Sequence, residues 1–210
     1  MTFVKICGIT NLPDALSAID AGADALGFNF HPPSPRYIQP LAARAIIDNL
    51  TEDVLTVGVF VNEETPKAVE EMAAEAGVTA LQLHGDESPA FCAALSPRYV
   101  IKVLALGPDF NPRVALKYDV QAFMVDVFDK RVRGGTGRIV DWSEARVLRD
   151  LVPKLFLAGG LSAANVREAI SVVEPYAVDA CSALEISPGK KNSQKMREFV
   201  RAVADVAVKP

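Results

Sequence analysis

The chain has 210 residues, of which 50% are hydrophobic and 23% are charged. This is enough apolar material for one packed core and too little chain for two ordinary domains, so we expect one domain over residues 1–210. With 22 Lys and Arg against 26 Asp and Glu, the net charge is −4, which argues against nucleic-acid or polybasic membrane partners. No apolar stretch reaches the roughly 18 residues of a membrane span, and the N-terminus lacks a signal-peptide pattern. A cytoplasmic location is therefore expected.

Strand-like apolar runs alternate with amphipathic, helix-like stretches along the chain. The predicted strands cover residues 3–7, 25–30, 54–61, 79–83, 99–103, 122–127, 155–158 and 176–180. The predicted helices cover residues 12–21, 40–49, 65–76, 89–95, 143–150, 163–172 and 193–206. Typical N-cap residues precede four of these helices, namely Asn11, Thr65, Ser88 and Ser162.

This alternation predicts parallel strands joined by helical crossovers, and eight such units close a (β/α)8 TIM barrel. An open, doubly wound sheet is the competing fold. Between the fifth and sixth strands, Pro108 and Pro112 leave room for only a short helix. In a barrel the chemistry belongs to the loops that follow the strands, so polar residues at the C-terminal strand ends are the candidates.

Two such candidates are Cys7, which ends the first strand, and Asp126, near the end of the sixth. Alternation puts Lys5 and Cys7 on one face, which we expect to be the interior because Val4 and Ile6 on the other face are purely apolar. A thiol near a positive charge can act as a base, and a carboxylate at a strand end can act as a general acid. Together they suit an aldose–ketose isomerisation. The alternatives are an inert thiol and a capping aspartate.

Segments rich in glycine or small residues follow the last three strands, at 133–137, 157–161 and 181–183. Gly159 and Gly160 would let the backbone approach an anion, and the loops after strands seven and eight are the usual phosphate site of this barrel. A phosphorylated small-molecule substrate is predicted. Tight turns without a ligand are the alternative.

Two further side chains have open roles. Arg36 lies in the proline-pinned segment 31–37, which suits bidentate binding of a carboxylate or phosphate, although a surface ion pair fits equally well. His84 could contact substrate or bond a loop. The three cysteines form neither a disulfide framework nor a metal motif, so no structural zinc site is expected.

Several segments share a distinctive order and spacing: Lys5–Thr10, Gly27–Phe30 with Ser34–Tyr37, Val57–Asn62, Gln82–Glu87, Gly134–Gly137 and Leu157–Leu161. As a set, from residue 3 to about residue 200, they resemble the phosphoribosylanthranilate isomerase family. The resemblance implies a step of tryptophan biosynthesis, the cofactor-free Amadori rearrangement of N-(5-phosphoribosyl)anthranilate to 1-(2-carboxyphenylamino)-1-deoxyribulose 5-phosphate. It implies that Cys7 is the base that takes the proton from C2, and that Asp126 is the acid that protonates the ring oxygen.

The same resemblance implies the substrate-binding residues. Arg36 would hold the anthranilate carboxylate and Asp179 would lie beside the sugar, with His84 as a further contact. The phosphate cradle would comprise Gly159, Gly160, Ser182 and Ala183.

The last strand departs from the family pattern Val-Asp-Val-Ser-Ser-Gly-Val-Glu, because Cys181 replaces the first serine and Ala183 the glycine. A thiol is a poorer donor than a hydroxyl, and alanine resists positive φ, so weaker or shifted phosphate binding is expected. Cys181 would face either Cys7 or the helix layer.

Other functions remain open on the sequence. An aldolase could use Lys5 or Lys102, the latter expected to point inward on the fifth strand, as a Schiff-base lysine. The related histidine-pathway sugar isomerase uses two aspartates, which Cys7 disfavours. A barrel that only binds a phosphorylated ligand is the non-enzymatic alternative. In each case a monomer or a homodimer is expected.

Overall fold

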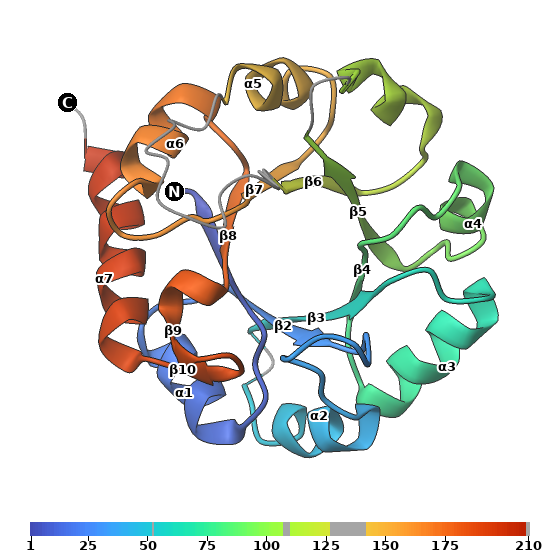
Figure 1. Cartoon of the computed structure of the whole chain (residues 1–210), viewed down its shortest axis with the longest axis horizontal. Helices are drawn as coiled ribbons and strands as arrows, with labels where there is room; N and C mark the ends of the chain where they lie inside the picture. The colour runs from blue at the N-terminus through green and yellow to red at the C-terminus, as the bar shows by residue number, and fades with distance from the viewer. Residues whose placement is uncertain (52, 107–109, 127–141, 209–210) are drawn as a thin grey trace.

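The computed structural model describes residues 1–51, 53–106, 110–126 and 142–208. Eight parallel strands close into a barrel in chain order, which confirms the predicted (β/α)8 fold and excludes the open sheet (Figure 1). These strands are β1 (Phe3–Cys7), β2 (Ala25–Asn29), β3 (Leu55–Phe60), β4 (Ala80–Leu83), β5 (Tyr99–Ala105), β6 (Ala122–Asp126), β7 (Leu155–Ala158) and β8 (Ala177–Ala180). A short antiparallel hairpin, β9 (Glu185–Ser187) and β10 (Lys190–Lys191), follows β8.

Helices form a ring outside the barrel (Figure 1). The α-helices are α1 (Leu12–Asp20), α2 (Pro40–Ile47), α3 (Pro66–Ala76), α4 (Pro89–Ala93), α5 (Ser143–Arg149), α6 (Val166–Val173) and α7 (Ser193–Ala204). Three 3-10 helices accompany them: η1 (Pro112–Lys117), η2 (Ser182–Leu184) and η3 (Asp205–Val208). The short helix expected between the fifth and sixth strands is η1. Among the described residues, no helix is both long and apolar enough to cross a membrane.

Local capping sets the starts of three helices as predicted. The side chains of Asn11, Thr65 and Ser88 each accept a hydrogen bond from a backbone N–H in the first turn of α1, α3 and α4. The expected cap at Ser162 is wrong. There the Asn165 side chain accepts from the Ser162 N–H at 2.8 Å, which holds residues 162–165 in a turn, and α6 begins at Val166.

Strand alternation divides the apolar residues into two layers. Outward residues such as Val4 and Ile6 pack with the helices in one large buried cluster, and inward residues such as Ile101 and Met124 fill the barrel in a second cluster. Lys5 is fully buried on the inward face, as predicted.

Lys102 does not point inward as expected. On β5 the inward residues are Tyr99, Ile101 and Val103, which leaves Lys102 on the helix-facing side. Its Nζ lies 2.6 Å from Glu87 Oε2, and both side chains are 2% exposed. It also donates to the Gly85 carbonyl at 2.6 Å. Lys102 therefore stabilises the loop between β4 and α4, and its place outside the barrel removes it as a Schiff-base candidate.

We predict that Lys102→Met lowers the free energy of unfolding by about 3–5 kcal/mol, because it leaves the Glu87 carboxylate buried without its cation. Urea denaturation followed by circular dichroism measures the change.

The matched control is Lys67→Met. Lys67 pairs with Glu71 on the surface of α3, where the two side chains are 84% and 66% exposed, so its loss should cost under about 1 kcal/mol. Equal losses in the two variants would contradict a structural role for the buried pair.

Candidate active site

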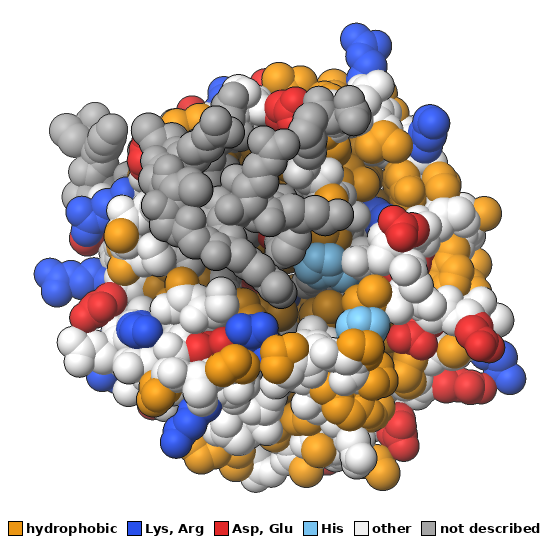
Figure 2. Space-filling view, viewed as in Figure 1, with side chains coloured by type: hydrophobic (Ala, Val, Ile, Leu, Met, Phe, Trp, Pro, Cys, Tyr) orange, Lys and Arg blue, Asp and Glu red, His pale blue; other side chains and the backbone are white. Residues whose placement is uncertain are grey.

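The candidate site lies at the C-terminal ends of the strands. Both histidines of the chain follow strand ends, and Figure 2 shows both of them near the middle of this face. Cys7 ends β1, Asp126 ends β6 and Asp179 lies within β8. The structure thus gathers the predicted residues at one end of the barrel.

An ion pair inside the barrel supports this site. Lys5 and Asp179 are register partners on β1 and β8, and Lys5 Nζ lies 2.8 Å from Asp179 Oδ1 with 0% and 9% of the side chains exposed. Burial raises the pKa of Asp179 to about 6 against the opposing effect of Lys5. Burial also disfavours the Lys5 ammonium, but Asp179 and Cys7 outweigh burial and raise its pKa above the ordinary value. Both groups are therefore ionised at neutral pH.

Gly27 makes room for these groups on the neighbouring strand. It is the register partner of Cys7, and a Cβ at this position would lie 2.7 Å from Cys7 Sγ and 3.0 Å from Lys5 Nζ. Any larger residue would therefore displace the thiol or the ammonium. A glycine in the middle of a strand, ordinarily unfavourable, marks this close approach.

The neighbours of Cys7 favour its thiolate form. A hydrogen bond from Cys181 is the largest cause that lowers its pKa well below the ordinary value, and Lys5 and Lys191 add to it against burial. The same hydrogen bond, with burial, raises the pKa of Cys181 far above its ordinary value. Cys181 therefore faces Cys7 rather than the helix layer, and neither cysteine is in a disulfide.

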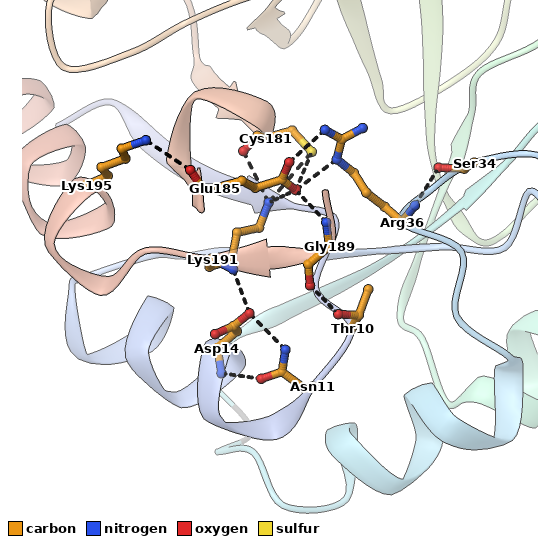
Figure 3. Close-up of polar contacts among 10 residues, drawn as sticks. All are labelled: Thr10, Asn11, Asp14, Ser34, Arg36, Cys181, Glu185, Gly189, Lys191 and Lys195. Atoms are coloured by element: carbon orange, nitrogen blue, oxygen red, sulfur yellow. Dashed lines mark hydrogen bonds and ion pairs between the residues drawn. The ribbon is translucent and has the colours of Figure 1, made fainter. Parts of the chain in front are cut away.

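A second charged cluster lies beside these thiols, around Glu185 (Figure 3). Arg36 donates from Nε to Glu185 Oε1 at 2.8 Å and from Nη2 to Oε2 at 2.7 Å. Lys191 lies 3.0 Å from Glu185 Oε1 and donates to the Cys181 carbonyl at 3.2 Å. Burial would raise the pKa of Glu185, but Arg36 and Lys191 lower it below the ordinary value. The cluster thus connects the loop after β2 to the hairpin after β8.

This cluster orients the Arg36 guanidinium. Glu185 binds one edge of the guanidinium, and the Arg36 side chain is 22% exposed. Arg36 therefore has the ion pair that was one of the two predicted alternatives, but with a buried partner rather than a surface one. The remaining edge of the guanidinium has N–H groups that can still bind a ligand carboxylate.

Asp126 and His84 meet on the opposite side of the barrel. His84 Nε2 lies 3.4 Å from Asp126 Oδ2, with 35% and 28% of the side chains exposed. On the other side of the ring, His84 Nδ1 lies 3.0 Å from Gln82 Nε2. The structure thus places a carboxylate with an imidazole partner across from the thiolate.

The candidate phosphate site has the expected backbone conformation. Gly159 and Gly160 have φ of 93° and 69°, and a Cβ on Gly160 would meet nothing within 4 Å, so its backbone is open to a ligand. Ser182 and Ala183 begin η2, and Ala183 is not among the residues with positive φ. The expected strain at Ala183 is therefore absent. The predicted segment 133–137 lies outside the described residues.

Sequence reasoning missed four polar residues that support the site: Glu87, Gln82, Glu185 and Lys191. Gln82 could have been found, because it precedes His84 by two residues and so shares its face of the strand. Glu87 and Glu185 carried no such signal, since their ion-pair partners Lys102 and Arg36 are 15 and 149 positions away in the chain. In the described part of the chain, no three His, Cys, Asp or Glu side chains group as metal ligands.

Fold and site together define a class: a (β/α)8-barrel enzyme with a thiol and a carboxylate at its mouth. The family model described as N-(5'phosphoribosyl)anthranilate (PRA) isomerase matches residues 4–202. The chain belongs to this family of isomerases, as the sequence resemblance predicted.

Known relatives agree over nearly the whole chain. The N-(5'-phosphoribosyl)anthranilate isomerases of Geobacter metallireducens and Thermotoga neapolitana are 46% and 47% identical, each over 96% of this chain and 98% of the relative. The crystal structure of the Thermotoga maritima enzyme has a TM-score of 0.89 and 41% identity, over 98% of this chain and 100% of that one. A further crystal structure of such an isomerase, in complex with reduced 1-(o-carboxyphenylamino)-1-deoxyribulose 5-phosphate, has a TM-score of 0.86 and 40% identity over the same shares.

We predict one thiolate per chain at neutral pH, belonging to Cys7. A cysteine whose pKa is lowered is ionised above that pKa, whereas burial raises the pKa of Cys92 to about 11. The ultraviolet absorbance of the thiolate, followed through a pH titration, measures this. Cys7→Ser should abolish the neutral-pH signal, and Cys92→Ser should keep it.

Cys181→Ala tests the cause, because losing the donor should move the midpoint upward toward the ordinary value. A wild-type signal that appears only near pH ~8.5, where a free cysteine ionises, would contradict the assignment.

Proposed function

We propose that this chain converts N-(5-phosphoribosyl)anthranilate to 1-(2-carboxyphenylamino)-1-deoxyribulose 5-phosphate, an Amadori rearrangement in tryptophan biosynthesis. The observation that carries the proposal is the Cys7 thiol on β1, whose neighbours lower its pKa well below the ordinary value, with Asp126 on β6 as a carboxyl group across the barrel mouth. The family assignment supports the same reaction, and so does the related isomerase crystallised with the reduced product.

Asp126 acts as the general acid in the first step. It gives a proton to the ring oxygen of the furanose, the C1–O bond breaks, and the anthranilate nitrogen supplies the electron pair of a C1=N bond. Asp126 is left as a carboxylate, and the positive charge on nitrogen makes the C2 proton acidic. A positioned acid of this kind contributes about 10²- to 10⁴-fold to rate.

Cys7 acts as the base in the second step. Its thiolate takes the C2 proton, the C–H electrons form a C1=C2 bond, and the nitrogen recovers its lone pair. The resulting enol then tautomerises to the ketone of the product. Lys5 lies below Cys7 and stays protonated because it forms an ion pair with Asp179. The thiolate therefore keeps a positive neighbour throughout the step.

The remaining candidates bind the substrate at its two ends. The open edge of the Arg36 guanidinium binds the anthranilate carboxylate, with Glu185 fixing its direction. The phosphate lies against Gly159, Gly160, Ser182 and Ala183, where positive-φ glycines leave the backbone open to an anion. Asp179 and His84 face the sugar between these ends.

The setting of the enzyme follows from its substrate. Phosphorylated sugars are retained inside the cell, so we place the reaction in the cytoplasm, carried out by residues 1–210 as one domain. A monomer or a homodimer remains the expected assembly. The related isomerase of Thermotoga maritima is a dimer, and monomers generated from it have been crystallised.

We predict that Cys7→Ala and Asp126→Asn each lower kcat by about 10²- to 10⁴-fold, because each removes a positioned base or acid. The fluorescence lost as phosphoribosylanthranilate is consumed measures turnover. Cys92→Ala and Asp48→Asn are the matched controls, since they make the same chemical changes away from the site. Near-normal turnover in either folded site variant would refute the catalytic role of that residue.

We also predict that Arg36→Met raises KM much more than it lowers kcat, because the carboxylate it binds is the same in ground and transition states. Arg36→Lys keeps the charge but loses the bidentate geometry, so its KM should be intermediate. An unchanged KM in Arg36→Met would leave Arg36 with the Glu185 ion pair as its only role.

A further inference from the structure

Three side chains on the inner wall of the barrel form a line from the interior to the mouth. Gln82 on β4 is 1% exposed, and its Nε2 lies 3.0 Å from His84 Nδ1. On the far side of the ring, His84 Nε2 lies 3.4 Å from Asp126 Oδ2. This distance is slightly longer than a good hydrogen bond.

The direction of the first contact follows from which atom of the Gln82 amide faces the imidazole. The amide nitrogen Nε2 lies 3.0 Å from His84 Nδ1, and an amide nitrogen can only donate a hydrogen bond. Gln82 therefore donates, and His84 Nδ1 accepts.

An acceptor at Nδ1 determines the chemistry of the other ring nitrogen. A neutral imidazole has a hydrogen on only one of its two ring nitrogens. If Nδ1 accepts a hydrogen bond, that hydrogen is therefore on Nε2. The Nε2–H group then lies on the side of Asp126.

The backbone of His84 is held independently of its ring. The His84 N–H donates to the Phe60 carbonyl at 2.8 Å, and the next amide, that of Gly85, donates to Glu87 at 3.1 Å. Lys102 binds the Gly85 carbonyl. These bonds fix the main chain at His84, so the Gln82 contact determines only the orientation of the ring and its tautomer.

We propose that Gln82 is a positioning residue for the general acid: it holds His84 in the Nε2–H tautomer, so that His84 donates to Asp126 Oδ2. This rests on the proposed function, in which Asp126 is the acid. Because Oδ2 then accepts a hydrogen bond, the transferable proton of the neutral carboxyl is directed to Oδ1, toward the mouth. After the proton has gone to the ring oxygen, the same donor stabilises the carboxylate that is formed.

The tautomer can be measured directly, because the chain has two histidines and His31→Gln leaves His84 as the only imidazole. Two-bond ¹H–¹⁵N correlation spectra distinguish a protonated from a bare ring nitrogen. They should be recorded at about pH 8.5, well above the usual pKa of about 6.5 for histidine. We expect Nε2 protonated and Nδ1 bare. A proton on Nδ1 would overturn the proposal whether or not the chain is active.

Gln82→Glu is nearly isosteric but offers only acceptors, so it should transfer the ring proton to Nδ1. We expect kcat to fall by about 10- to 100-fold while KM stays within about twofold, because the acid is misdirected but the substrate contacts remain. Gln39→Glu introduces the same charge at an exposed position and should change neither.

Gln82→Met is the second variant, for use if the buried carboxylate of Gln82→Glu prevents folding. It removes the donor without adding charge, so both tautomers should appear and kcat should fall with KM held. An unchanged kcat in this variant would overturn the proposal. A wild-type chain without isomerase activity would instead refute the proposed function, and the tautomer measurement would still stand.

Discussion

The Lys5–Asp179 ion pair is the interaction on which the rest of the site depends. A closed barrel of eight strands has an interior from which water is largely excluded, and a single charge there would be very costly. Lys5 and Asp179 neutralise each other as register partners at 2.8 Å. Because the pair is satisfied, the layer above it can hold a third ionised group. Cys7 lies in that layer, with Lys5 directly below it on the same strand, and its pKa is lowered well below the ordinary value.

The same principle organises the two sides of the mouth. On one side, Glu185 is buried between Arg36 and Lys191, so a rigid carboxylate orients the guanidinium and keeps an ammonium close to the thiols. On the other side, Asp126 faces an imidazole rather than a cation. The base thus has lysine and arginine side chains close by, which favour a thiolate, and the acid has an imidazole as its partner.

The sequence predicted the barrel well because strand alternation, capping residues and the glycines at turns are local signals. It placed Lys5 correctly, since one face of β1 is purely apolar. It placed Lys102 wrongly, because the face of β5 without the lysine is also apolar but points inward, and only the register of β5 with β4 and β6 decides this. The Arg36–Glu185 ion pair was out of reach for a similar reason, because its two residues are 149 positions apart in the chain. Pairing between distant segments is not visible in a single sequence.

The sharpest test of this arrangement is a crystal structure of the chain with reduced 1-(o-carboxyphenylamino)-1-deoxyribulose 5-phosphate bound. The phosphate should lie against Gly159 and Gly160, with Cys7 Sγ about 3–4 Å from C2, a near-attack distance. Asp126 should approach the sugar from the opposite side, beside the oxygen that closes the furanose ring. A ligand whose C2 lies far from Cys7, or whose sugar has Cys7 and Asp126 on the same side, would contradict the division of roles between base and acid.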